Sequence, residues 1–332
     1  MFFQSIGKRP SRLFFVAVSW SVLLFFSLLR CKSPESDQPP LCDYSILRVG
    51  GFEFIKPPLA LEPACESRAL LPLKRELVAL ADSLKNAAAI RQASVYFREF
   101  DHGEWFSIND AERYHPASLM KISLMLSVLQ IADATPGLLE EKLVYKRPES
   151  VVITPQYYNF PTIELGKSYS VHELLYYMIA NSDNHATWLL ASRVDTTRTK
   201  KLFFDLGLEE PVQDELQFTM TARECSVFFK SIYNSSLLSP EYADYAARLL
   251  SHCAFQEGFG KGFLGQTKMW HKFGEWSYAG HDNELHEAGV VYWQGKPYLI
   301  VIMTRGADRD KLAGAISLLS GAISKRLPAP AL

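Results

Sequence analysis

Ser118 and Lys121 are the two residues of this sequence whose types and spacing best suit covalent chemistry. Three residues apart on a helix, their side chains would share one face. They open an almost unbroken apolar run, residues 119–132, which predicts a buried helix. Burial lowers the pKa of a lysine because the charged form loses its hydration, and a neutral lysine can take the serine proton to create a nucleophile. Alone the pattern is weak, since Lys121 could also extend from a core helix into solvent.

Two later motifs could complete such a site. Ser182, Asp183 and Asn184 lie between two predicted helices, where a loop can direct side chains into a cleft. The same residue types are preferred helix caps, and one loop can serve both purposes. Lys272 and Gly274 follow at the end of a predicted strand. The lysine could be a plain edge charge, whereas the glycine would let a substrate approach the backbone closely.

Ser-x-x-Lys, Ser-Asp-Asn and Lys-x-Gly, in that order and with helices between them, form a specific combination. Over about residues 70–325 the chain resembles the penicillin-recognising serine hydrolases, above all the class A β-lactamase-related group. The segments that carry the resemblance most strongly are Pro116-Ala117-Ser118 and Ser182-Asp183-Asn184-His185-Ala186.

The resemblance implies a role for each motif residue. Ser118 would be the nucleophile that forms an acyl-enzyme, and Lys121 would accept its proton. Ser182 would relay a proton to the leaving nitrogen, while Asn184 would hold Lys121 or the substrate amide.

The resemblance also implies how the substrate is bound. Lys272 would attract the substrate carboxylate, and Gly274 would leave room beside the strand. The backbone N–H groups of Ser118 and Glu275 would form an oxyanion hole that stabilises the tetrahedral intermediate.

The third motif departs from the family pattern. Between the lysine and the glycine the family usually has Thr or Ser, whose hydroxyl helps to bind the carboxylate, and here the residue is Phe273. Nearby polar candidates are His271, His286 and Arg305. We take His286 as a substrate-binding candidate because it precedes a strand that should neighbour Lys272. It could equally be an ordinary strand-edge histidine.

A second departure concerns deacylation. Class A β-lactamases carry a glutamate on a long loop, and it activates the hydrolytic water. The corresponding stretch here, residues 208–219, is short and has no Glu followed four residues later by Asn. Its acidic side chains are more typical of a solvated surface. They are Glu209, Glu210, Asp214 and Glu215.

Periodicity predicts the elements that must position these motifs. Strands are expected at residues 93–100, 105–108, 269–272, 288–293 and 298–304. Helices are expected to begin at Pro72 and Ser118, and to cover residues 171–180, 185–193, 222–233 and 308–325. The predicted fold class is α+β: an antiparallel sheet from the N- and C-terminal segments, flanked by helices, with a helical subdomain inserted at about 119–255. Residues 69–332 would form this domain.

The first 68 residues are expected to export and tether it. Basic residues followed by an apolar stretch make residues 1–30 a signal peptide or an uncleaved membrane anchor, and either places the rest outside the cytoplasm. Cys31 follows a sequence resembling a bacterial lipobox, although Arg30 departs from it, so Cys31 is a lipidation candidate. Residues 31–68 are expected to be a Pro-rich tether followed by an irregular segment.

Four cysteines remain, which outside the cytoplasm could form disulfides. Cys42 with Cys65 and Cys225 with Cys253 are the pairings closest in sequence, and four buried thiols are the alternative.

Composition and charge exclude several function classes. The formal net charge of -1 offers no footprint for nucleic acid. The eight histidines are scattered, so we expect neither a metal site nor another cofactor. The leading hypothesis is an exported, monomeric serine hydrolase acting on β-lactams. The alternatives are a D-Ala-D-Ala carboxypeptidase acting on peptidoglycan-like peptides and a non-hydrolysing acylatable sensor.

Overall fold

Strands from both ends of the chain form one five-stranded antiparallel sheet. Its strands are β3 (Gln92–Glu99), β4 (Trp105–Ile108), β7 (Met269–Trp276), β8 (Asn283–Trp293) and β9 (Lys296–Gly306). Their order is β4-β3-β9-β8-β7, so β3 from the N-terminal part pairs with β9 from the C-terminal part, and β7 lies at one edge. The predicted α+β fold class is therefore confirmed. The computed structural model describes residues 44–50, 57–212, 217–264 and 267–327.

The β8–β9 hairpin shows how local sequence sets this sheet. Gln294 and Gly295 both have positive φ, 54° and 80°, the backbone of a two-residue turn whose twist suits antiparallel strands. Both strands are buried almost continuously, which is typical of a sheet covered on two faces. The strands extend further than predicted, because tertiary pairing continues the ladder past the apolar residues.

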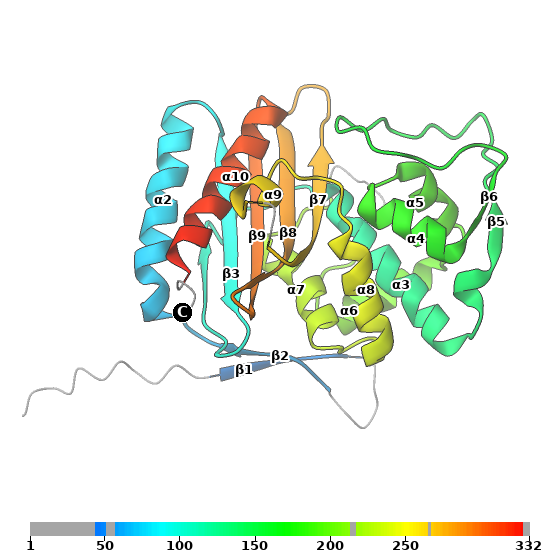
Figure 1. The fold of residues 1–332 in the computed structure, drawn as a ribbon, viewed down its shortest axis with the longest axis horizontal. Helices are drawn as coiled ribbons and strands as arrows, with labels where there is room; N and C mark the ends of the chain where they lie inside the picture. The colour runs from blue at the N-terminus through cyan, green and yellow to red at the C-terminus, as the bar shows by residue number, and fades with distance from the viewer. Residues whose placement is uncertain (1–43, 51–56, 213–216, 265–266, 328–332) are drawn as a thin grey trace, which may run out of the picture. The chain divides into compact units, whose positions relative to one another are not determined.

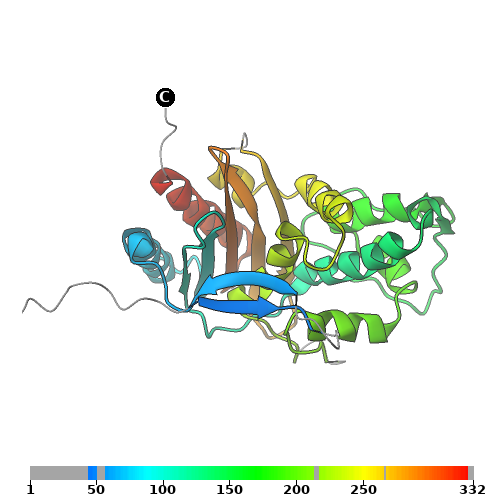
Figure 2. The same ribbon diagram turned by 90° about the horizontal axis from the view of Figure 1, so that it is seen from below.

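Helices cover both faces of the sheet (Figures 1 and 2). One face packs against α2 (Leu71–Asn86), α9 (Phe259–Gly262) and α10 (Arg309–Arg326), and the other against α7 (Ala222–Tyr233). Leu77 and Ile316 are fully buried on the first face, and Phe229 on the second. The sheet therefore separates two hydrophobic clusters.

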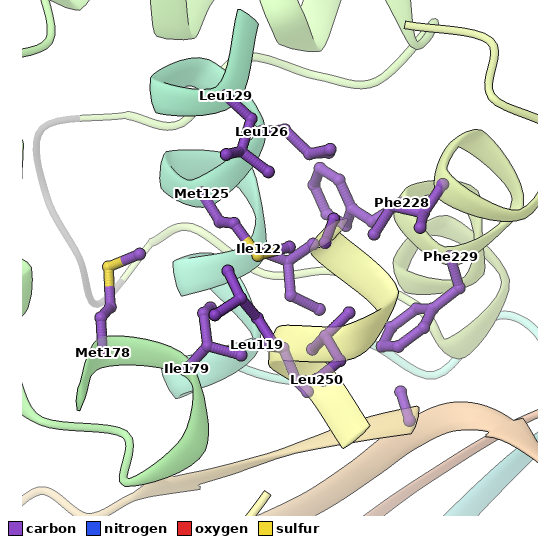
Figure 3. Packing of buried hydrophobic residues seen from close by; sticks show 14 of the residues in the cluster. Leu119, Ile122, Met125, Leu126, Leu129, Met178, Ile179, Phe228, Phe229 and Leu250 are labelled. Atoms are coloured by element: carbon purple, nitrogen blue, oxygen red, sulfur yellow. The ribbon is translucent and has the colours of Figure 1, made fainter. Parts of the chain in front are cut away.

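The predicted helical subdomain surrounds α3 (Lys121–Ala134) (Figure 3). Its neighbours are α4 (Val171–Ala180), α5 (Asn184–Ala191), α6 (Thr196–Asp205) and α8 (Pro240–Ser251). Residues 117–134 are long and apolar enough to cross a membrane by length and composition. Within this domain, however, Ile122, Met125 and Leu129 are fully enclosed by neighbouring helices. A helix that is apolar all round is expected at such a central position.

The chain between α3 and α4 contains short elements that periodicity did not predict. They are the 3-10 helix η3 (Leu138–Glu140) and the paired strands β5 (Lys142–Val144) and β6 (Ser168–Ser170). Between β5 and β6 lies a long irregular segment that reaches the cleft described below. Long loops of this kind are often functional.

The expectation of an irregular segment in the later part of residues 31–68 is wrong in part. Antiparallel strands β1 (Tyr44–Arg48) and β2 (Pro58–Pro63) form there, followed by the 3-10 helix η1 (Arg68–Leu70). Glu62 of β2 pairs with Lys230 of α7, whose side chain is fully buried. This long-range ion pair fastens β2 to the domain, and no local pattern signals it.

The cysteines differ in part from the predicted pairings and exclude four free thiols. Cys65 is disulfide-bonded, whereas Cys225 and Cys253 are free and buried, so their predicted pairing is wrong. Cys31 and Cys42 lie outside the described residues, as does the predicted signal peptide or anchor at residues 1–30.

Candidate active site

Ser118 lies on a strained turn at the N-terminal end of α3. The turn is the 3-10 helix η2 (Ala117–Met120), where the sequence predicted the first turn of an α-helix. Ala117 has a φ of 51°, a left-handed conformation that a non-glycine residue adopts only at a cost of about 1–3 kcal/mol. The turn is held by His115, whose Nδ1 accepts a hydrogen bond from Ala117 N at 3.1 Å. Ser118 is partly exposed and lines the cleft.

Lys121 lies one turn further and points at the second motif. Its side chain is 6% exposed. Its Nζ donates hydrogen bonds to Asn184 Oδ1 at 2.6 Å, to Ser182 Oγ at 3.1 Å and to the Ser182 carbonyl. Burial, and next the charge of Lys272, hold the pKa of Lys121 well below its usual value. The lowered pKa favours the neutral amine, which contacts Ser182 and lies one turn from Ser118, as general base catalysis requires.

The Ser182-Asp183-Asn184 loop combines capping with site geometry. Asp183 caps α5 by accepting a hydrogen bond from His185 N at 2.8 Å, so the capping interpretation holds for this residue. Its other oxygen accepts from Ile163 N at 2.9 Å, which anchors the loop from behind. Ser182 has a φ of 56° and is fully buried. This anchored loop thus positions both Ser182 and Asn184 against the Lys121 amine.

Gly274 of β7 lies against η2. A Cβ at this glycine would lie 3.1 Å from Ser118 N and 3.0 Å from Leu119 N. Side chains do not fit at such distances without movement of the backbone. Glycine therefore lets the edge strand approach the turn that carries Ser118, and it brings the Glu275 backbone toward the predicted oxyanion hole.

Lys272 is placed differently from what the resemblance implies. Its side chain is fully buried, and its Nζ donates to the Phe273 carbonyl at 2.9 Å and lies 4.3 Å from the centre of the Phe273 ring. Burial lowers the pKa of Lys272 to about 8. It lines neither of the two cavities beside Ser118, but its charge is close enough to lower the pKa of Lys121.

Glu275 contributes its side chain as well as its backbone. Its Oε1 accepts a hydrogen bond from Tyr157 N at 2.8 Å, and its buried Oε2 has no partner within hydrogen-bond geometry in the described part of the chain. Burial raises the pKa of this carboxyl group, an effect that the Tyr157 N–H partly offsets. The sequence motifs point only to the Glu275 backbone, because no motif marks the side chain at this position.

Two adjoining cavities meet at Ser118, with volumes of about 380 and 570 Å³. The smaller one is bordered by Gln156, Tyr157, Tyr278 and Arg309. The larger one has a more apolar wall, which includes Met120, Leu124, Val152, Pro211 and Phe218. Both are lined by Ser118, Thr154, Asn184, Glu275 and Trp276.

His286 does not reach the cleft. It is fully buried, its Nε2 donates to the His115 carbonyl at 2.9 Å, and its Nδ1 accepts from Thr304 N at 3.3 Å. Arg305 likewise holds the segment that precedes His115, because it donates a hydrogen bond to the Arg113 carbonyl at 2.6 Å. The structure therefore contradicts His286 as a substrate contact and places it behind the turn that carries Ser118, because its side chain faces the sheet interior.

His271 of β7 is buried and does not point into the cleft. It lies in a cluster with Cys253 and with Glu287 of β8. Its Nδ1 lies 2.7 Å from Glu287 Oε1, and both side chains are at most 2% exposed. Although burial disfavours its charge, Cys253 and Glu287 raise the pKa of His271 to about 10. Among the described residues no group of three or more His, Cys, Asp or Glu side chains could hold a metal ion.

Segment 208–219 contains four acidic residues, of which the structure describes two, Glu209 and Glu210. Neither of these two borders the cleft. Glu209 is 84% exposed, 3.7 Å from Arg113, and Glu210 is half-exposed, 3.3 Å from Lys200. Asp214 and Glu215 lie outside the described residues.

Comparison with known proteins places the chain in a family. No curated protein is significantly similar to it in sequence. Among solved structures, a β-lactamase from Chitinophaga pinensis has a TM-score of 0.68 at 15% identity, covering 77% of this chain and 100% of its own. An acyl-enzyme complex of a PBP-A variant with penicillin G has a TM-score of 0.64 at 21% identity, covering 77% and 96%.

A third structure, a β-lactamase from Xanthomonas campestris pv. campestris, has a TM-score of 0.65 at 17% identity, covering 77% of this chain and 99% of its own. At these identities the three structures establish a shared fold. The sequence profile of the β-lactamase enzyme family matches residues 72–327, which include all three motifs. The chain therefore belongs to the β-lactamase enzyme family, within the penicillin-recognising serine enzymes.

Proposed function

We propose that this chain is a class A-related serine β-lactamase that works through an acyl-enzyme on Ser118. The observation that supports this most is the position of Lys121. Its amine is buried, holds a lowered pKa and contacts both Ser182 and Asn184. A lysine kept neutral at this place can deprotonate a serine one turn away.

The proposed reaction proceeds in balanced steps. Neutral Lys121 takes the proton of Ser118 Oγ while the Oγ–C bond to the β-lactam carbonyl forms. The backbone N–H groups of Ser118 and Glu275 stabilise the oxyanion. The C–N bond then breaks, and the proton passes through Ser182 to the leaving nitrogen. Water finally cleaves the ester and restores Ser118 with its proton.

Deacylation is proposed to be the slow step. Of the described acidic residues in segment 208–219, Glu209 and Glu210 face solvent and pair with Arg113 and Lys200. No described residue of that segment therefore supplies a base to the water. This favours an accumulating acyl-enzyme, which is also what a D-Ala-D-Ala carboxypeptidase or an acylatable sensor would give with penicillin.

Intact-mass spectrometry separates these possibilities. The protein is incubated with a penicillin and, separately, with a peptide ending in D-Ala-D-Ala. A penicillin adduct that decays with release of hydrolysed product supports a β-lactamase, and a permanent adduct without turnover of the peptide supports a sensor. Cleavage of the peptide supports the peptidase. Ser118→Ala should abolish the adduct, and an undiminished adduct would overturn the assignment of Ser118.

We also propose that the protein is exported, anchored in the membrane and monomeric. The support is the basic and then apolar order of residues 1–30, followed by Cys31. Cell fractionation with and without Cys31→Ser distinguishes a lipid anchor, which the variant loses, from an uncleaved helix, which it keeps. Recovery of the wild-type protein in the cytoplasm would contradict both anchors, and a dimer on size-exclusion chromatography would contradict the monomer.

A further inference from the structure

His115 connects the turn that carries Ser118 to the sheet. Its ring nitrogen Nδ1 accepts a hydrogen bond from Ala117 N at 3.1 Å. Its own backbone N donates to Glu284 Oε2 at 2.8 Å, and its carbonyl accepts from His286 Nε2 at 2.9 Å. The ring and both backbone groups of His115 therefore take part in fixing the approach to the nucleophile.

The two partners of the His115 backbone belong to β8 and lie inside the protein. Glu284 is 4% exposed and His286 is fully buried. Arg305 of β9 donates to Glu284 Oε1 at 2.7 Å. Although burial opposes ionisation, His286 and Arg305 lower the pKa of Glu284, so that its carboxylate remains charged and accepts from His115 N. The sheet, rather than the turn itself, thus sets the position of the His115 backbone.

The imidazole ring of His115 lies at the edge of the cleft. It is partly exposed and borders the larger cavity beside Ser118. The ring stacks on Trp276, with centroids 5.0 Å apart and an angle of 21° between the planes. Since the ring is neither enclosed nor distant from solvent, protons from water can reach it.

The contact with Ala117 defines the protonation state that the turn requires. A backbone N–H can only donate, so Nδ1 of His115 must be the ring nitrogen without a proton, and the proton of the neutral ring is on Nε2. A protonated ring is a donor at both nitrogens, and its Nδ1–H would face the Ala117 N–H. The hydrogen bond is then lost at the residue whose backbone is held at a φ of 51°.

Several titratable or charged groups face His115 and influence when its ring takes up a proton. The Glu284 carboxylate favours a charged ring, but it is already paired with Arg305. Two further groups border the larger cavity together with the ring and have opposite charges when ionised. By element, the groups are Glu284 and His286 of β8, Arg305 of β9, Glu275 of β7 and Lys121 of α3.

We propose that His115 is a positioning residue for Ser118, and that only its neutral ring holds the strained turn in the reactive conformation. A proton taken from solvent at Nδ1 releases the Ala117 N–H, and the turn relaxes. Ser118 Oγ then moves out of line with Lys121 and with the backbone N–H groups of the oxyanion hole. The inference rests on the proposed acyl transfer at Ser118. It adds to Lys121 a second group that must be deprotonated before acylation.

Two variants separate the acceptor from the ring. In His115→Asn the side-chain oxygen can accept from the backbone N–H two residues further on, and it does not titrate. His115→Phe keeps a ring beside Trp276 and has no acceptor. The rate of penicillin adduct formation at Ser118 is measured by intact mass on the full chain in detergent. At pH 8 we expect the Phe variant to react at least tenfold more slowly than the Asn variant, because a displacement of about 1 Å costs about 100-fold.

The pH profile gives a readout that a merely structural role would not change. Rates are compared at pH 5 and pH 8, an interval within which histidines ordinarily titrate. The ratio of the rate at pH 5 to that at pH 8 should be about tenfold larger in His115→Asn than in the wild type, since one of the two groups that must lose a proton is gone. Lys121 is present in both proteins, so the difference between their profiles belongs to His115.

A matched control is His252→Asn, which removes an imidazole from an exposed position at the end of α8. It should leave both the rate at pH 8 and the ratio unchanged. Thermal unfolding of all variants at both pH values shows whether a slow rate arises from loss of the fold. If His115→Phe does not fold, the comparison of His115→Asn with the wild type still decides the matter.

The outcomes separate this inference from the proposed function. A wild-type adduct at Ser118, together with a pH 5 to pH 8 ratio that is the same in His115→Asn, supports acyl transfer and overturns the role of the His115 ring. Equal rates for folded His115→Phe and His115→Asn at pH 8 overturn it as well. If the wild type forms no adduct at any pH from 5 to 9, the proposed function is wrong, and the inference fails with it.

Discussion

Lys121 Nζ lies 2.6 Å from Asn184 Oδ1, although the two residues are 63 positions apart in the chain. The contact joins the first motif to the second across the interface between α3 and the loop before α5. Asn184 is itself held by Thr154, whose carbonyl accepts a hydrogen bond from Asn184 Nδ2 at 2.9 Å. Asn184 thus sets the direction of the lysine amine, and a charge introduced at this position would change the pKa of that amine.

Replacement of Asn184 should move the pH dependence of acylation. In the wild type the pKa of Lys121 is lowered by burial, so acylation should rise with pH as this amine loses its proton. Asn184→Asp places a negative charge beside the ammonium and raises its pKa, so the midpoint should shift upward by about one unit. Acylation rates from pH 5 to 10 check this. Asn86→Asp, at the exposed end of α2, is the control, and an unshifted midpoint in N184D would contradict the prediction.

Removal of the Lys121 amine should slow acylation without unfolding the protein. A positioned base contributes about 100- to 10,000-fold, and we expect Lys121→Met to lose a factor in that range. Because the lysine is 6% exposed, methionine of similar length should be tolerated or stabilising. Stopped-flow acylation and thermal unfolding are measured on the same samples. Lys311→Met, at an exposed lysine of α10, should change neither. Full activity in K121M would contradict the assigned base.

A methyl group at Gly274 should separate β7 from η2. The added Cβ would lie 3.0–3.1 Å from backbone atoms of residues 116–119, which cannot turn away as a flexible side chain can. We expect Gly274→Ala to slow acylation at least tenfold and to lower the melting temperature. Gly314→Ala is the matched control, since nothing lies within 4 Å of its Cβ. In the middle of α10 it should stabilise the fold by about 0.5–1 kcal/mol. Unimpaired acylation in G274A would exclude a role for the close approach.

The buried pair that fastens β2 should dominate the stability of that segment. Lys230 is fully buried, and Glu62 is its ion-pair partner. Glu62→Gln would leave the lysine without a counter-charge, so the free energy of unfolding should fall by about 3–5 kcal/mol at pH 7. Asp244→Asn breaks the exposed pair with Arg248 and should cost less than about 1 kcal/mol. Denaturant unfolding measures both, and equal losses would contradict the anchoring role of Glu62.

Product release from a chromogenic cephalosporin should show a burst close to one product per enzyme, followed by a slow steady state. The reason is that Glu209 and Glu210 face solvent, away from the cleft. Glu209→Ala and Glu210→Ala should therefore leave the steady-state rate within about twofold, as expected of exposed residues without a catalytic contact. A linear time course with rapid turnover would reveal a deacylating base elsewhere.

Local sequence was enough for the parts of this protein that short-range physics controls. The apolar run after Ser118 predicted the central buried helix, and periodicity predicted the helices that are α4 and α7 and the two strands that pair as β8 and β9. The order of the three motifs predicted the family, because catalytic groups at helix starts and strand ends occupy places that a pattern can mark.

Tertiary structure alone decided what those groups face. His286 turned inward to hold the His115 carbonyl, and Lys272 became enclosed beside Phe273. β2 was fastened by Glu62 and Lys230, which are 168 positions apart. Each of these three placements depends on which distant segment of the chain packs against the side chain. Sequence periodicity carries no information about such long-range partners. Sequence therefore indicated the candidate nucleophile and base, whereas tertiary packing determined which side chains border the cleft and which are enclosed behind it.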